Sequence, residues 1–159
     1  MANFLMDDLD QRILSYLIGN ARVSFSEVAR ECGISAAAAY QRVKKMEEAG
    51  IIIGSRFIVQ PEMLGYGICA FVGVRLSSAS PYDAAVTSLT RIPEVVECHF
   101  VTGEYALLLK IYCRDNRHLL SIIAEKIHKI SGVADTYTFV SLDKAFERQI
   151  FVRTSGSES

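Results

Sequence analysis

Hydrophobic residues recur at helical spacing early in the chain and in short β-branched runs later. From Asp8 to about Gly50 the apolar positions follow a period near 3.6 residues, whereas residues 67–142 alternate strand-like runs with helical segments. Pro61 and two nearby glycines interrupt both periods. The pattern predicts a first domain at residues 1–60, a linker at 61–66, a second domain at 67–150 and a polar tail at 151–159.

Local signals place two helices at the start of the first domain. The first helix begins at Asp7 or Asp8, whose carboxylate can accept hydrogen bonds from the free amides of the first turn, and it stops at Gly19. The second begins with a capping box at Ser24-Phe25-Ser26-Glu27, in which serine and glutamate bond each other's backbone amides. It ends at Gly33, because glycine adopts the left-handed backbone of a sharp helix exit.

A third helix and a short hairpin complete the first domain. Ser35 caps this helix and Gly50 closes it. Its apolar stripe consists of Ala39, Val43 and Met46. The β-branched run "IIIGSRFIV" at residues 51–59 is broken by a Gly-Ser pair and predicts a hairpin. Three helices with a short turn between the second and third, followed by a hairpin, make a winged helix-turn-helix. The alternative is a plain three-helix bundle with a β-arm.

The second domain is predicted to be a ferredoxin-like βαββαβ unit of the split βαβ type, which makes the chain α+β overall. Its expected elements are strand 67–76, helix 80–91, strands 95–102 and 105–113, helix 115–130 and strand 133–142. Ser80-Pro81 and Asp115 supply helix starts, and Gly132 follows the end of the last helix. Residues 102–105 form a tight turn between the second and third strands.

Both faces of the predicted sheet are apolar. The run "ALLLKIY" at residues 106–112 shows this, because successive side chains of a strand point to opposite faces. The two helices cover one face only. A second copy of the domain would cover the other face in a two-fold dimer; the alternative is a monomer in which the N-terminal domain covers it.

Composition and charge narrow the class of protein. Half of the 159 residues are apolar and the formal net charge is -1, as in a soluble globular protein with no global preference for nucleic acid or membranes. The four cysteines show no paired or zinc-type spacing, which indicates free thiols and suits a cytoplasmic location. We expect no export signal, membrane span, metal or cofactor.

Two stretches of the chain are typical of one known family. The more specific is the block "LDQRILSYLIGNARVSFSEVARECGISAAAAYQRVKKMEEAGIII", and "VTGEYALLLKIY" extends the similarity into the second domain. On these residues the chain resembles the Lrp/AsnC, or feast/famine, family of transcription regulators over nearly its full length. The resemblance implies a DNA-binding head and a ligand-sensing, oligomerising ferredoxin-like domain of the RAM type. It also implies double-stranded DNA as partner, homodimers that can assemble into octamers, and an amino acid as effector.

The turn that the resemblance associates with the effector departs from the family pattern. Gly103, Glu104, Tyr105 and Ala106 stand where the family commonly has glycine, an acidic or amide residue, any residue and aspartate. Alanine can neither pair with nor hydrogen-bond a small ligand. We expect Glu104 to point away from the side of position 106, so that the glutamate does not simply replace the missing aspartate.

The third helix is the expected DNA-reading element. Its core stripe leaves the opposite side to face the major groove, where Gln41 can pair with an adenine edge and the alanines can touch thymine methyls. Arg42 and Lys45 flank this side, and we expect phosphate contacts there in preference to an internal salt bridge for Arg42. The predicted DNA-binding residues are Ser35, Ala36, Ala37, Tyr40, Gln41, Arg42, Lys44, Lys45 and Arg56.

Few base-reading groups suggest loose sequence preference. Acidic and basic side chains balance over residues 1–60, so a single head should bind DNA weakly. Several linked heads raise the effective concentration of the later contacts. We therefore expect an oligomer that bends or wraps DNA and prefers easily deformed sequences.

Two other functions stay open at the level of sequence. One is an effector-independent, nucleoid-organising protein, which the alanine at position 106 favours. The other is an enzyme acting on tetrapyrroles, since such enzymes exist among proteins that resemble this family. No nucleophile, base and orienting group converge by spacing, and His99, His118 and His128 are interpreted as surface or interface residues. His99 is expected on one strand face with Val95, Glu97 and Val101.

Overall fold

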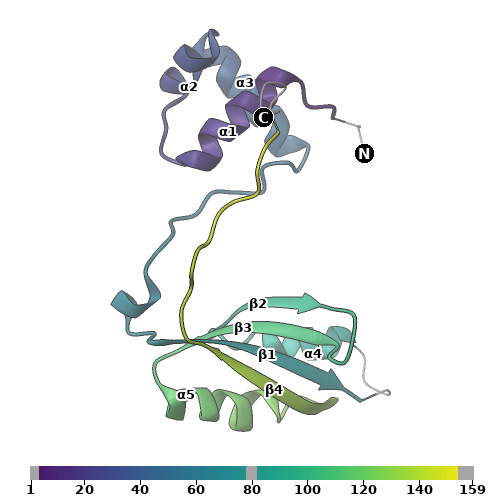
Figure 1. Cartoon of the computed structure of the whole chain (residues 1–159). Coiled ribbons are helices and arrows are strands. Elements are labelled where there is room, and N and C mark those ends of the chain that lie inside the picture. Colours follow the sequence, from purple (N-terminus) through teal and green to yellow (C-terminus); the bar gives the residue numbers. More distant parts are fainter. Residues whose placement is uncertain (1–3, 78–81, 154–159) are drawn as a thin grey trace. The chain divides into compact units, whose positions relative to one another are not determined.

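The computed structural model of the chain describes residues 4–77 and 82–153, and it contains two compact units. One unit comprises the residues before Val59 together with those after Ala145, and the other is the stretch Val59–Ala145. The first is helical, and the second is a sheet with helices on it (Figure 1). The predicted linker contains a 3-10 turn, η1 (Pro61–Leu64).

The helices of the first unit begin and end where the sequence predicts. They are α1 (Asp8–Gly19), α2 (Phe25–Cys32) and α3 (Ala36–Glu48). The Asp7 carboxylate accepts from the Asp10 backbone amide, and the Asp10 carboxylate accepts from the Asp7 backbone amide. Ser24 and Glu27 form the second capping box. Gly33 ends α2 with a φ of 71°, a conformation that glycine adopts without the Cβ clash of other residues. These caps satisfy the backbone amides that helix starts leave free.

The head has its own small apolar core. Ile13 of α1 and Val28 of α2 are fully buried, and the predicted stripe of α3 faces them. The buried members of this cluster are Ile13, Val28, Cys32, Val43 and Met46. The stripe prediction for the third helix is therefore confirmed.

An ion pair links α3 to the start of α1. One guanidinium nitrogen of Arg42, Nη1, donates to Asp7 Oδ2 and to Asp10 Oδ1, each at 2.7 Å. Asp10 is 4% exposed, so its charge requires a partner. Hydrogen bonding to the Asp10 backbone, followed by the bond from Arg42, lowers the pKa of Asp7.

This ion pair corrects the expectation for Arg42. Sequence spacing along α3 offered no acidic partner before Glu47, which made an internal salt bridge the weaker interpretation. The partners instead lie 32 and 35 residues earlier in the chain, where only tertiary folding brings them within reach. Arg42 holds two helices together, and any phosphate contact must use the part of its guanidinium that remains exposed.

The hairpin predicted for residues 51–59 does not form. These residues contain no strand, and only Ile52 packs against the head core. Ile53, Phe57 and Ile58 are 95%, 74% and 77% exposed. A two-stranded hairpin is marginal by itself, and this one would bury too little apolar surface to offset the entropy of ordering it.

The second unit has the predicted ferredoxin-like order. Its elements are β1 (Ile68–Leu76), α4 (Tyr82–Leu89), β2 (Val95–Phe100), β3 (Leu107–Cys113), α5 (Asn116–Ser121) with a π-helical extension η2 (Ile122–Ile127), and β4 (Val133–Ser141). The antiparallel sheet has the strand order β2-β3-β1-β4. Asp115 caps α5 as predicted, whereas the Ser80-Pro81 start lies outside the described residues.

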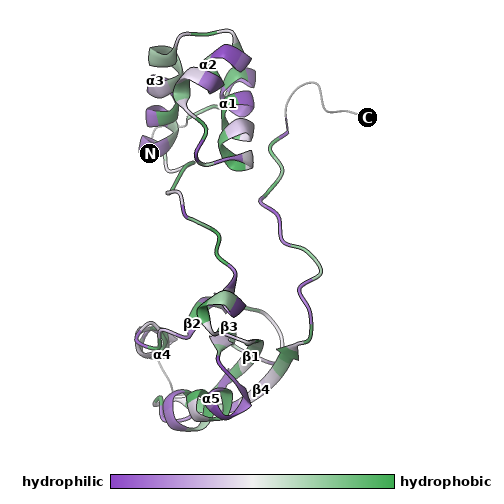
Figure 2. Ribbon diagram, turned by 90° about the vertical axis from the view of Figure 1, so that its left-hand side faces the viewer, coloured by the Kyte–Doolittle hydropathy of each residue, from purple (hydrophilic) through white to green (hydrophobic). Residues whose placement is uncertain are grey.

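Both helices cover the same face of the sheet, as Figure 2 shows. Alternate residues of β1 and β3 are fully buried against Leu89 of α4 and Ile122 of the last helix. The strand residues of this core are Ala70, Val72, Val74, Leu107, Leu109, Ile111 and Cys113. The opposite face, termed the open face below, is only partly covered.

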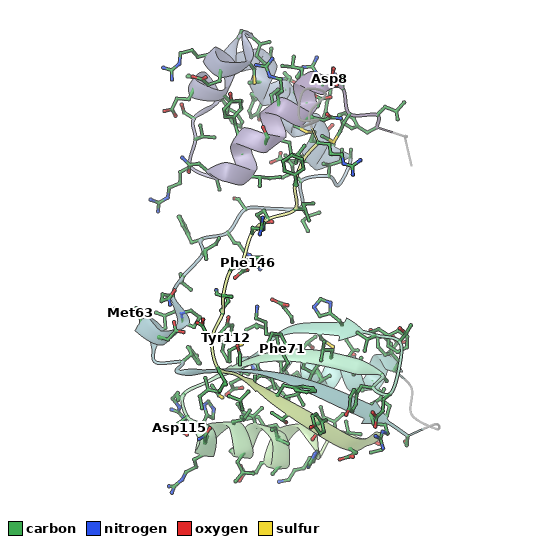
Figure 3. The ribbon with its side chains drawn as sticks, in the orientation of Figure 1. Asp8, Met63, Phe71, Tyr112, Asp115 and Phe146 are labelled. Atoms are coloured by element: carbon green, nitrogen blue, oxygen red, sulfur yellow. The ribbon has the colours of Figure 1, made fainter. Side chains whose placement is uncertain are left out.

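The pairing register defines the open face. Phe71 on β1 lies opposite Lys110 on β3 and Phe139 on β4, and Gly73 lies opposite Leu108 and Tyr137. Phe71, Tyr137 and Phe139 are 36%, 54% and 52% exposed (Phe71 and Tyr112 are labelled in Figure 3). The two-sided apolar pattern of the strands is thus confirmed, with aromatic side chains at the surface of this unit.

The Arg42 ion pair predicts a loss of stability when the guanidinium is removed. Arg42→Met leaves the buried Asp10 carboxylate without its cation, so the free energy of unfolding should fall by about 1–3 kcal/mol. Urea denaturation of the DNA-free protein measures this loss. Lys45→Met is the matched control, since Lys45 is exposed on the same helix and its replacement should change stability by less than about 0.5 kcal/mol. Equal stability of the two variants would contradict a structural role for Arg42.

Candidate nucleic-acid interface and effector turn

The α2–α3 turn fixes how α3 begins. Gly33 reverses the chain, and the amide of Ile34 bonds the carbonyl of Ala29 at 2.9 Å. Ser35 then caps α3 by accepting from the amide of Ala38 at 3.1 Å. The result is a helix whose first turn is exposed and whose amides at Ala36 and Ala37 face no side-chain cap. Such a helix start favours anions such as phosphate.

One side of α3 is exposed along its length. Ala36, Ala37, Tyr40, Gln41, Lys44 and Lys45 are all exposed, whereas Ala38 is half-buried and Ala39 is buried. This burial pattern confirms which side of the helix faces the core. Contact of the exposed side with DNA stays a prediction.

The side chains of this surface differ in how firmly they are held. The Tyr40 ring packs edge to face against Phe25 of α2, with centroids 5.5 Å apart, so its position is set by the helix-turn-helix itself. Lys44 lies 3.9 Å from Glu48 one turn later. Gln41 and Tyr40 are the exposed members with both reach and hydrogen-bonding groups.

Arg56 lies outside the three helices. It is exposed within the segment 51–60, which has no regular structure, so the structure does not bring it to α3. Nearby, the guanidinium of Arg22 stacks on the ring of Phe57, 4.6 Å from its centroid. This contact attaches the segment to the turn between α1 and α2.

The predicted effector turn connects β2 and β3 and is docked on β1. The Val101 amide donates to the Ala106 carbonyl at 3.1 Å, and Gly103 has a φ of 114°. These features confirm the tight turn. Glu104 forms an ion pair with Arg75 on β1, at the end of the open face.

Residues 101–106 are not a regular strand, which changes the expected geometry. The Ala106 amide donates to the Val74 carbonyl at 2.9 Å, and the Tyr105 ring lies over Gly73. Glu104 and Tyr105 both contact open-face positions of β1, although they are adjacent in sequence. The expectation that Glu104 and Ala106 face opposite sides is therefore wrong: residues two apart in a regular strand share a face, and residues 101–106 do not form a regular strand.

The histidines occupy three separate sites. His99 lies 3.5 Å from Glu97, and His128 lies 2.8 Å from the hydroxyl of Thr136. The pairing register shifts between Val95 and Glu97, which puts Val95 on the helix face and corrects the predicted shared face. A β-bulge has this effect because one extra residue reverses the alternation.

His118 is more than a surface residue. Its side chain is 15% exposed, and Nε2 lies 3.2 Å from a Glu94 oxygen that Lys126 also bonds at 2.9 Å. Its Nδ1 accepts from the Arg114 amide, so in the neutral ring Nε2 carries the proton. Burial alone would raise the pKa of Glu94, but the bonds from Lys126 and His118 lower it. Sequence spacing gave no signal for this cluster.

A metal-binding cluster and a membrane-spanning helix are both absent from residues 4–77 and 82–153, which the structure describes. Within them no group of histidine, cysteine, aspartate or glutamate side chains is arranged to hold a metal ion. In the same residues no helix has the length and apolarity needed to cross a bilayer. The four cysteines are free thiols.

Known families match both units. A profile of the Lrp/AsnC ligand binding domain matches residues 69–151, and a winged helix-turn-helix DNA-binding profile matches residues 6–53. The regulatory protein AsnC of Escherichia coli strain K12 is 39% identical over 150 residues, which cover 94% of this chain and 99% of that protein. The matched proteins are transcriptional regulators, which excludes the enzyme interpretation.

Solved structures agree with this match. The structure of E. coli AsnC superposes with a TM-score of 0.86 at 38% identity, over 92% of this chain and 99% of that one. The feast or famine regulatory protein Rv3291c of Mycobacterium tuberculosis, complexed with L-methionine, gives 0.88 at 27% identity, over 94% and 100%. The chain therefore belongs to the Lrp/AsnC family of DNA-binding transcriptional regulators.

Proposed function

We propose that this regulator reads DNA mainly through shape and through several linked heads, and that an amino acid modulates it. The observation that carries the proposal is the exposed side of α3, where Tyr40 and Gln41 are the two uncharged side chains that combine reach with hydrogen-bonding groups. The proposed interface comprises Ser35, Ala36, Ala37, Tyr40, Gln41, Lys44 and Lys45, with Arg56 and the exposed part of Arg42 as phosphate contacts. A DNA-binding role and the four free cysteines support a cytoplasmic location.

Charge within the head supports weak binding by a single copy. Arg42 pairs with both Asp7 and Asp10, Arg30 pairs with Glu31, and Lys44 lies near Glu48. Counterion release drives protein–DNA affinity in proportion to the phosphates neutralised, so paired cations contribute less. Affinity must then come from more than one head on the same DNA.

The open face supports a homodimer as the source of those heads. Its aromatic side chains are about half exposed, and Lys110 pairs with Glu97 of the adjacent strand rather than projecting alone. A self-complementary face of this kind closes a two-fold dimer. Assembly of dimers into octamers is a further proposal that rests on the family.

The match of the second unit to the Lrp/AsnC ligand binding domain supports an amino acid as the effector of this regulator. The M. tuberculosis protein described above was solved with L-methionine, as was the regulator NMB0573 of Neisseria meningitidis, which has a TM-score of 0.86 at 26% identity over 91% of this chain and 94% of that one. In this chain the effector turn offers the backbone amides of residues 103–105 and the Glu104–Arg75 pair, whereas the Ala106 amide bonds the Val74 carbonyl and position 106 has no aspartate. We propose residues 103–106 as the effector-contacting turn.

Direct base reading by Gln41 has a defined signature. Gln41→Ala should relax preference at one base position by about 1–3 kcal/mol, because a bidentate contact to adenine is lost there. Binding to a panel of operators with single base changes, at constant salt, measures this loss. A uniform loss across the panel, or none, would assign specificity to DNA shape alone.

Dimerisation through the open face should be lost when a charge is placed on it. Phe139→Glu should reduce the molecular mass in solution to that of a monomer. It should also weaken the affinity for DNA by about 10²- to 10⁴-fold, because linked heads are lost. Light scattering and binding titrations measure the two effects. Met63→Glu alters an equally apolar side chain that is 84% exposed in η1, so it should change neither. A dimer that survives Phe139→Glu would exclude this face as the interface.

An amino-acid effector should stabilise the folded protein. At millimolar concentration, a ligand that binds only the folded state raises the melting temperature by mass action. A thermal-shift screen of the twenty amino acids tests this. If none of them shifts the melting temperature, the effector-independent, nucleoid-organising function takes the place of amino-acid control.

A further inference from the structure

Gly73 is buried on a face where its neighbours are exposed. It lies in β1, in the middle of the sheet, and its open-face neighbours along the strand, Phe71 and Arg75, are both exposed. Glycine has no side chain of its own to withdraw from solvent. The group that covers it is the ring of Tyr105, which comes from the effector turn.

The contact leaves no room for any other residue at position 73. A Cβ atom there would lie 2.7 Å from Tyr105 Cγ and 2.8 and 3.0 Å from the two Cδ atoms. Carbon atoms in ordinary contact are about 3.5–4.0 Å apart. Rotation of the ring about its own axis leaves Cγ in place, so relief requires a new Tyr105 rotamer or a shift of the turn.

Position 73 requires glycine because the Tyr105 ring occupies the place of a Cβ atom, and not because of its backbone conformation. Gly73 is absent from the glycines with positive φ and pairs regularly with both neighbouring strands. Glycine inside a strand is unfavourable compared with alanine, because it loses more backbone entropy on folding. A glycine in a central strand often marks a close approach of another group, and Tyr105 is that group.

Three consecutive turn residues are attached to three consecutive residues of β1. Glu104 pairs with Arg75, the Tyr105 ring lies on Gly73, and the Ala106 amide bonds the Val74 carbonyl. The ring centroid is also 6.3 Å from that of Tyr137 on β4. The Glu104–Arg75 ion pair is exposed to solvent and the Ala106–Val74 bond joins backbone atoms, so the ring contact is the one that depends on the side chain at position 73.

We propose that Gly73 is a positioning residue for the effector turn: it provides the seat for Tyr105 that fixes residues 104–106 against β1. This role rests on the proposed function only in so far as the turn contacts the effector. Gly73 itself touches no ligand in this scheme. It acts by holding the backbone amides of the turn in one arrangement, which lowers the ordering cost of ligand binding.

Gly73→Ala in the full-length protein tests the seat. Overpacking by one methyl group should displace the turn, so the Ala106 amide should exchange its hydrogen roughly tenfold to hundredfold faster while β1–β3 amides stay protected. Any amino-acid-induced shift of the melting temperature should shrink or vanish in the same variant. Gly19→Ala is the matched control, because nothing lies within 4 Å of a Cβ at that position, and it should change neither readout.

A double variant separates the seat from a general effect of alanine in β1. Tyr105→Ala removes the ring, so adding Gly73→Ala to it should cause no further loss and should stabilise the strand, which reverses the sign of the single substitution. The same double variant should fold even if Gly73→Ala alone does not. Additive losses, a double variant that fails to fold, or normal Ala106 protection in Gly73→Ala would each overturn the proposal.

The two proposals fail in different ways. If no amino acid stabilises the unmodified protein, the effector function is lost, but hydrogen exchange at Ala106 still decides whether Gly73 seats the turn. If an amino acid does stabilise it and Gly73→Ala responds as the unmodified protein does, the seat is rejected and the effector function stands.

Discussion

The buried carboxylate of Asp10 is the constraint on which the arrangement of the head depends. A carboxylate that is 4% exposed is tolerated only with a cation and hydrogen bonds, and Arg42 supplies the cation from the middle of α3. The same nitrogen bonds Asp7, which caps α1. Helix capping, charge neutralisation and the placement of α3 are thus one set of contacts. Apolar packing alone would leave α3 freer to rotate about its own axis, because its buried stripe contains only three residues.

In the second unit the controlling feature is a sheet that is apolar on both faces. One face is completed within the chain by α4 and the last helix, which gives the unit its core. The open face carries aromatic residues and one glycine seat, and the effector turn lies across its end. Because the turn and the open face share β1, the proposed sensing and assembly surfaces are built on one strand.

Local features of the site were predictable and long-range ones were not. The caps at Asp7, Ser24, Ser35 and Asp115 follow from side chains that bond amides three residues away, so they are visible in the sequence. The exposed side of α3 follows from helical periodicity in the same way. The hairpin at residues 51–59 failed because β-branched composition says nothing about whether a partner surface exists to bury it.

What the sequence by itself determined is the order of the elements, their boundaries to within a few residues, the family and the side of α3 that faces outward. Each depends on interactions within a few residues or on a repeating period. Only the tertiary structure decided that Arg42 serves the fold, that Glu94 collects His118 and Lys126, and that Tyr105 rests on Gly73. These contacts join residues 24 to 35 positions apart. No local pattern specifies which distant group will pair with a buried charge or occupy the space beside a glycine.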